Sequence, residues 1–167
     1  MFIGRSKPIA SASPRGGVVI YKHLDSSLDF EVITDELRDC IIFRLLPVDI
    51  ICAAVYIPPS NSKYSTPEYM ENLQLISSNF KNTPTYIVGD LNARYGEITP
   101  NNDNAIFYAP NPDKTINTNG RVLTRLLNEE TDFMIINGLR TERTQCDSDF
   151  TYFRGELCSQ LDIVIER

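Results

Sequence analysis

The sequence predicts a mixed domain, an α/β or α+β layered sandwich in which helices cover a sheet. Short apolar runs rich in β-branched and aromatic residues, typical of strands, are mixed with two segments of helical periodicity. The 167 residues, 42% of them hydrophobic, suffice for one buried core and are too few to promise two. We therefore expect residues 1–167 to form a single domain.

The first third of the chain is predicted to be a β-meander. Its strand candidates are "VVIYKH", "FEVIT", "CIIFRL" and "IICAAVYI". Short charged or proline-containing segments separate them, as in tight turns. The last strand ends at "PPS", because proline has no backbone N–H to give to a ladder.

The first helix is predicted over "STPEYMENLQLISSNF", residues 65–80. Ser65 and Glu68 have the spacing of a capping box, and Pro67 is tolerated in a first turn. Four apolar side chains recur on one face: Tyr69, Leu73, Ile76 and Phe80. The strand "TPTYIVGD" follows, and we expect it to be buried on both faces because its apolar run does not alternate.

The second half contains a long segment, residues 92–120, that is dense in Asn, Pro and Asp and has no clear period. Segments of this kind are often functional. A second helix is predicted over "GRVLTRLLNEE", with an apolar stripe of Val122, Leu123, Leu126 and Leu127. Strands are expected at "DFMIING", "FTYF" and "SQLDIVIE".

Charge and cysteine content exclude several classes of protein. A net charge of −6 argues against a broad basic face for nucleic acid, so a polyanion would have to be held locally, with help from a metal ion. The four cysteines include no C-x-x-C pair, which excludes a zinc cluster and suggests buried thiols in a reducing compartment. No apolar run is long enough to span a membrane, and we expect an intracellular protein.

Polar residues stand where three predicted strands end or are interrupted. Asp90 and Asn92 follow a buried strand, Tyr56 ends another, and Asp162 interrupts an apolar one. Such residues can simply turn the chain or pack, but α/β sheets also bind ligands at strand ends. A buried Asp162 carboxylate would need a histidine, an arginine or a metal ion as partner. We expect these residues to converge at one edge of the sheet.

The order of the segments resembles that of a known superfamily. "GGVVIYKH", "VYIPPS", "GDLNAR", "NTNGRVL" and "FTYFRGELCSQLDIVIE" together resemble the endonuclease/exonuclease/phosphatase superfamily, over nearly the whole chain. "NTNGRVL" leading to "MIING" is most similar to the endonuclease domains of LINE-type retrotransposons, which accompany reverse transcriptases. The resemblance implies a DNase I-like layered β-sandwich flanked by helices, and hydrolysis of phosphodiesters.

The resemblance also implies roles for individual residues. Asp90 would position or activate the attacking water and act as a metal ligand, and Asn92 would bind the phosphate or the nucleophile. Tyr56 would contact the phosphate, and Asp162 would orient a catalytic histidine. Thr151 and Ser159 would lie near the nucleic-acid groove, so that DNA is the implied partner and the nucleus an implied location. Mg²⁺ is the expected metal, with Mn²⁺ as the alternative.

The sequence departs from the family pattern at both ends. The family has a metal-binding glutamate on an early strand and a final Ser-Asp-His strand, and this sequence has neither. Its one histidine, His23, is in the wrong segment and is expected at the surface or at a strand end. The resemblance therefore implies an incomplete, partial domain with an exposed sheet edge, marginal stability and weak or no cleavage by itself.

Three classes of function stay open. The first is a DNA endonuclease, which the "NTNGRVL" segment favours. The second is a phosphatase or phosphodiesterase acting on a lipid or inositol phosphate, which the acidic net charge favours. The third is a non-catalytic remnant, which the missing glutamate and histidine favour.

Overall fold

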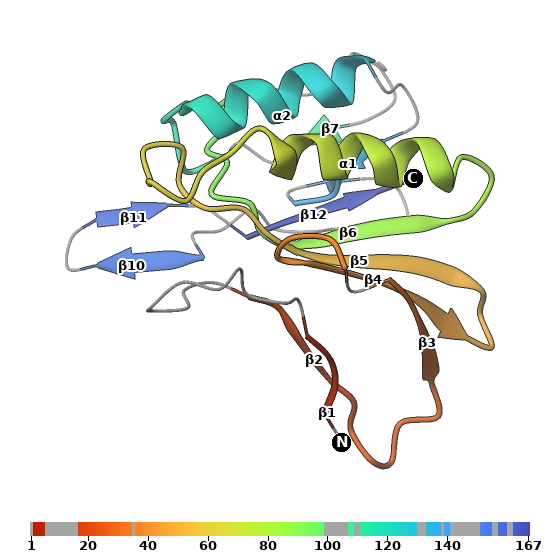
Figure 1. Ribbon diagram of the computed structural model, residues 1–167. Coiled ribbons are helices and arrows are strands. Elements are labelled where there is room, and N and C mark those ends of the chain that lie inside the picture. Colours follow the sequence, from red (N-terminus) through yellow and green to blue (C-terminus); the bar gives the residue numbers. More distant parts are fainter. Residues whose placement is uncertain are drawn as a thin grey trace.

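The computed structural model describes residues 2–5, 17–34, 36–98, 107–108, 111–129, 133–137, 139–140, 151–154, 157–159 and 162–167. Its centre is a six-stranded mixed sheet with two helices on one face (Figure 1). The strands of this sheet, in spatial order, are β3 (Asp29–Thr34), β4 (Cys40–Leu46), β5 (Ile50–Tyr56), β6 (Thr85–Asp90), β12 (Asp162–Glu166) and β8 (Met134–Ile135). The expected mixed α/β class is therefore observed.

The sheet combines a meander with a crossover. Strands β3, β4 and β5 are antiparallel neighbours, as the sequence predicts. The chain then crosses through the first helix, so β6 lies parallel to β5, and β12 enters antiparallel between β6 and β8. Strand β2 (Val19–Tyr21) does not belong to this meander, because it pairs with β1 (Phe2–Arg5) in a separate hairpin.

Helix α1 (Glu68–Asn79) packs on the sheet through the face that its periodicity predicts. Tyr69, Leu73 and Ile76 are at most 1% exposed. The predicted capping box is wrong, because the helix starts later than that spacing requires. Pro67 is the N-cap and no side chain caps the helix, while the Ser65 N–H donates to the Ser62 carbonyl in the preceding turn.

Helix α2 (Thr118–Glu129) lies beside α1 over the same sheet face (Figure 1). Its stripe is buried as predicted at Leu123, Leu126 and Leu127 and half-buried at Val122. Both helices and the facing strands share one large apolar core. Burial of this face supplies most of the driving force for folding.

The opposite face of the sheet is covered less completely. Ile41, Phe43 and Cys52 form a smaller cluster there, against which Val18 and Ile20 pack from the hairpin. Figure 1 places this hairpin on the side of the sheet away from the helices. The expectation that β6 is buried on both faces is wrong for this reason. Its helix-facing Thr85 and Ile87 are buried, whereas Tyr86 and Val88 are half-buried.

The remaining described strands form two short pairs. β7 (Phe107–Tyr108) pairs with β9 (Leu139–Arg140), and β10 (Tyr152–Arg154) pairs with β11 (Leu157–Ser159). Neither described helix is long and apolar enough to cross a membrane.

Two of the four cysteines, Cys40 and Cys52, lie in the described core strands β4 and β5. Cys40 and Cys52 are buried free thiols, as expected, and burial raises the pKa of Cys40 to about 12. Cys146 and the side chain of Cys158 lie outside the described residues.

Candidate functional site

Strand register brings the predicted site residues together. Tyr56 pairs with Asp90 across the parallel β5 and β6, and Asp90 pairs with Asp162 across the antiparallel β6 and β12. The convergence expected from the sequence is therefore present, at the C-terminal ends of β5 and β6 and the start of β12. We call Tyr56, Asp90 and Asp162 the strand-end row.

The strand-end row faces away from the helices. The adjacent row consists of Val55, Gly89 and Ile163, of which Val55 and Ile163 are buried in the core under the helices. Because side chains alternate along a strand, the next row points to the other face. The less covered face of the sheet therefore carries the candidate site.

Asn92 lies two residues beyond Asp90, in a tight turn. Its φ of +45° is left-handed, a conformation that Asn tolerates better than most residues. Its backbone N–H donates to Asp90 Oδ1 at 2.9 Å, and its Nδ2 donates to the Ile57 carbonyl at 2.9 Å. The Asn92 side chain also hydrogen-bonds to Asp90, in addition to the bond from its backbone N–H. Asp90 is thus a turn residue that Asn92 holds through both its backbone and its side chain.

The electrostatics of the row favour a bound cation. Burial and the Asp162 charge raise the pKa of Asp90, against the hydrogen bonds from Asn92 that lower it. Burial, and then the charges of Asp90 and Asp39, raise the pKa of Tyr56. Negative groups therefore gather here, and a divalent cation would relieve their repulsion.

The donor set fits a hydrated magnesium ion. Among the described residues no group of three or more His, Cys, Asp or Glu side chains could hold a metal. The strand-end row offers two carboxylates, Asp90 and Asp162, on neighbouring strands. Mg²⁺ typically takes one or two carboxylates and keeps several waters, so this pair suits it better than zinc.

Asp162 differs from the expectation in its burial. It begins β12 rather than interrupting it, and it is exposed to solvent. The argument that its carboxylate must have a buried partner is therefore wrong, because water solvates the charge. Its backbone N–H donates to Thr151 Oγ1 at 3.0 Å, which brings Thr151, a further predicted residue, next to the row.

The other residues named from the sequence lie apart from the row or have side chains outside the described residues. Ser159, the last residue of β11, pairs through its backbone with Tyr152 of β10. The Ser159 side chain lies outside the described residues. The His23 side chain is 80% exposed, on the segment that follows β2, as expected for a surface residue.

Two asparagines that sequence reasoning did not single out tie α2 to the strand ends. Asn117 Nδ2 donates to the Asn92 carbonyl at 2.8 Å, and its Oδ1 accepts from the N–H groups of Arg94 and Gly120 at 3.0 and 2.8 Å. The buried Asn119 bridges the carbonyls of Pro58 and Leu91 with its Nδ2, at 3.1 and 3.2 Å. The "NTNG" motif was recognised in the sequence, but the carbonyl groups to which its two asparagines donate belong to residues distant in the chain.

Glycines allow the close approach that these contacts need. A Cβ on Gly120 would lie 1.9 Å from the Arg94 carbonyl oxygen, and one on Gly89 would lie 1.9 Å from that of Val55. Gly89 also has a φ of +145°, which a side chain rarely allows. The glycine immediately before Asp90 is therefore required by strand packing.

A buried ion pair closes the segment after the turn. Arg94 donates to the Asp113 carboxylate in bidentate fashion, with both nitrogen–oxygen distances at 2.7 Å, and Asp113 is 3% exposed. Asn111 fixes the same segment by donating to the Gly96 carbonyl at 2.9 Å. This part of the long polar segment is thus an ordered support for the strand ends.

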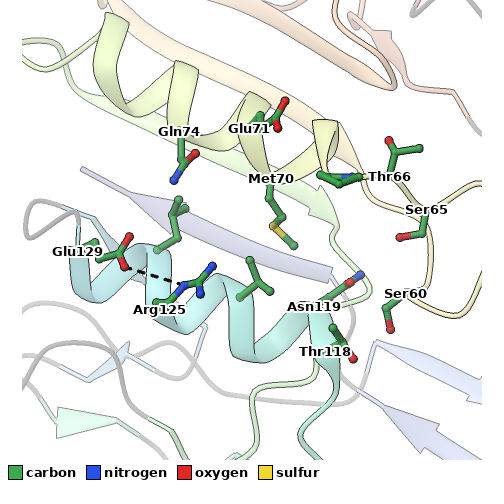
Figure 2. A pocket seen from close by; sticks show the side chains of 13 residues that line it. Ser60, Ser65, Thr66, Met70, Glu71, Gln74, Thr118, Asn119, Arg125 and Glu129 are labelled. Atoms are coloured by element: carbon green, nitrogen blue, oxygen red, sulfur yellow. Dashed lines mark ion pairs between the residues drawn. The ribbon is translucent and has the colours of Figure 1, made fainter.

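Two cavities lie near the strand ends. The larger, about 470 Å³, lies between α1 and α2 and is lined by residues such as Met70, Asn119 and Arg125 (Figure 2). It includes none of the strand-end row. The smaller, about 200 Å³, is lined in part by Tyr56. The smaller cavity is therefore the one connected to the candidate chemistry.

Comparison with known proteins leaves the family open. No protein-family model matches the chain, and no curated protein is similar to it at a significant level.

Proposed function

We propose that this chain is a metal-dependent phosphodiester hydrolase domain, and that DNA is its substrate, as in LINE-type endonucleases. The observation that carries the proposal is the in-register row of Tyr56, Asp90 and Asp162. Hydrolysis of a phosphodiester needs charge neutralisation at the phosphoryl oxygens and an oriented water, and oxygen-rich side chains with a hard cation supply both.

The residues of the site would divide the work. Asp90 and Asp162 would hold Mg²⁺, which supplies positive charge to the phosphoryl group when bound. The Tyr56 hydroxyl would donate to a phosphate oxygen, since its pKa is raised and it keeps its proton at neutral pH. Asn92 would act chiefly as a positioning residue, because its backbone N–H and one amide hydrogen already fix the turn.

We expect slow turnover at the strand-end row. The one histidine of the chain is exposed on another segment, so no imidazole can serve as general acid or base at the row. General acid–base catalysis typically contributes about 10²–10⁴ in rate. We therefore expect magnesium binding to be the more sensitive readout and nicking to be weak.

The experiment combines magnesium titration with a plasmid-nicking assay. We expect Mg²⁺ to raise the melting temperature of the native chain and to support slow nicking. Asp90→Ala should abolish the magnesium effect and lower any nicking rate about 10²–10³-fold, the usual loss for one electrostatic stabiliser. Asp25→Ala is the matched control, because the Asp25 side chain is 91% exposed on the segment after β2. Equal magnesium responses in the native chain and Asp90→Ala would overturn the proposal.

A second candidate is a phosphatase or phosphodiesterase of the same superfamily acting on a lipid or inositol phosphate. The net charge of −6 favours it, since long DNA is repelled more than a small phosphate. Magnesium-dependent phosphate release from inositol phosphates without plasmid nicking would select this candidate. Magnesium binding without either activity would instead identify a non-catalytic remnant.

A further inference from the structure

The cavity of about 200 Å³ lies at the same sheet edge as the strand-end row. Three tyrosines line it, Tyr56, Tyr64 and Tyr69, together with Arg38 and Asp39. Strands β4 and β5 are antiparallel, so Asp39, just before β4, stands beside the end of β5, and the Tyr56 N–H donates to the Asp39 carbonyl at 2.9 Å. Tyr56 thus belongs both to the cavity and to the proposed site.

The walls of the cavity are held in place. The Tyr69 hydroxyl donates to Asp39 Oδ2 at 2.8 Å, and Asp39 is 7% exposed. The Arg38 guanidinium lies 5.2 Å from the centre of the Tyr69 ring and pairs with Glu68 at 3.8 Å. The Lys63 ammonium lies 5.0 Å from the centre of the Tyr64 ring. Aromatic rings with adjacent cations are the usual surroundings of a nucleotide base and its phosphates.

We propose that this cavity receives one nucleobase, from the nucleotide next to the phosphate held at the strand-end row. This inference rests on the proposed function and specifies its substrate as DNA with an unpaired or splayed base. The volume is below the roughly 300–1,000 Å³ of sites for drug-sized ligands, which suits a single flat ring system.

The chemistry of the walls favours a base over a phosphate or an inositol ring. The buried Asp39 carboxylate repels an anion that enters the cavity, whereas the half-buried Tyr64 ring can stack on a flat aromatic ring. Lys63 is exposed beside the Tyr64 ring, where the charged backbone of the same strand would pass. An inositol polyphosphate would need several cations inside the cavity, and the lining includes one, Arg38.

The test uses a short single-stranded oligonucleotide that carries one 2-aminopurine. The chain contains no tryptophan, so the fluorescence of this base can be excited without protein background. With calcium in place of magnesium to prevent cleavage, we expect binding of the native chain to quench the 2-aminopurine by stacking. Tyr64→Ala should lose most of the quenching and bind about tenfold more weakly, within the range for one stacking ring.

Two variants and one altered probe serve as controls. Tyr64→Phe keeps the ring and should keep the quenching, whereas Tyr21→Ala, at a tyrosine that is 75% exposed on β2, should behave as the native chain. An oligonucleotide with an abasic residue in place of the 2-aminopurine should bind less tightly. Equal quenching and affinity in Tyr64→Ala and the native chain would overturn the inference.

Failure of the proposed function gives a different result. If the row does not bind metal, the magnesium response of Asp90→Ala matches that of the native chain, while quenching that depends on Tyr64 persists. In that case the cavity is a base-binding site without hydrolysis. Loss of the Tyr64 effect with retention of the Asp90 effect removes only the base-binding inference.

Discussion

At the scale of single residues, opposing interactions act on the Asp90 carboxylate. One carboxylate oxygen closes the turn to Asn92, while the group as a whole is half-buried beside Asp162. Burial and like charge make the ionised form costly in the folded state. Strain of this kind is typical of sites where a ligand, here a cation, restores the balance.

Replacing the Asp90 charge should therefore stabilise the metal-free protein at neutral pH. The folded-state pKa of Asp90 lies above its ordinary value of 3.8, so ionisation costs stability as pH rises through the interval between the two values. Asp90→Asn keeps an oxygen for the Asn92 N–H and does not titrate. We expect its melting temperature to exceed that of the native chain at pH 7 without magnesium, with the difference vanishing below pH 4. A lower melting temperature for the variant at pH 7 would contradict this reading.

Gly89 is the residue whose side-chain size should matter most for stability. Gly89→Ala would place a methyl group on the Val55 carbonyl oxygen, at 1.9 Å, in a backbone conformation that alanine resists. We expect a loss of about 3 kcal/mol or more in the free energy of unfolding, measured by urea denaturation. Gly17→Ala is the control, since its φ of +110° is also positive but nothing lies within 4 Å of the added group. It should cost about 1 kcal/mol.

At the scale of elements, the N-terminus of α2 holds the strand ends in position. Asn117 accepts from the Gly120 N–H as a helix cap does and reaches the turn after β6 with its amide. Asn119 joins the exits of β5 and β6. The helix therefore fixes the spacing of Tyr56 and Asp90 from behind the sheet.

Removing this tether should weaken both the fold and the site. Asn117→Ala loses a helix cap, for which losses of about 0.5–2 kcal/mol are typical, and leaves the Arg94 N–H and the Asn92 carbonyl without this partner. We expect a fall of about 2 kcal/mol in the free energy of unfolding and a weaker magnesium response. Asn128→Ala, at an exposed position near the other end of α2, should change neither. Identical denaturation curves for the two variants would argue against the tether.

At the scale of the whole molecule, the sheet is covered unevenly. Two helices bury one face, while a hairpin packs against part of the other (Figure 1). Strand β3 ends the six-stranded order, and its Ile33 is 40% exposed. Exposed apolar residues on an edge strand favour pairing with other chains.

Self-association should therefore respond to charge on β3. Ile33→Lys adds a charge to the edge and should lower the light scattering of concentrated protein while leaving the melting temperature nearly unchanged. Glu31→Lys, at an exposed position two residues earlier, removes no apolar area and serves as the control. Unchanged scattering in Ile33→Lys would show that this edge does not drive association.

The sequence by itself predicted the two helices and the strands of the six-stranded sheet in their order, but not the short strands β1, β7, β9 and β11. The apolar stripes of the two helices predicted which side chains would be buried, because period is a local property of the chain. Polar residues at the ends of apolar runs likewise marked the candidate site. Where local chemistry competes with packing, the prediction was wrong, as at the expected capping box of Ser65 and Glu68.

Only the tertiary structure decided which residues become neighbours. Register sets Asp162 opposite Asp90 and Tyr56 beside it, and register depends on pairing between segments far apart in the chain. The same holds for Asp39, which reaches the cavity wall through a helix tyrosine thirty positions away, and for the asparagine tether of α2. Coverage of the sheet decided that Asp162 is exposed and that the outer side of β6 is half-buried. No local pattern encodes such coverage, because it depends on which elements pack against each face.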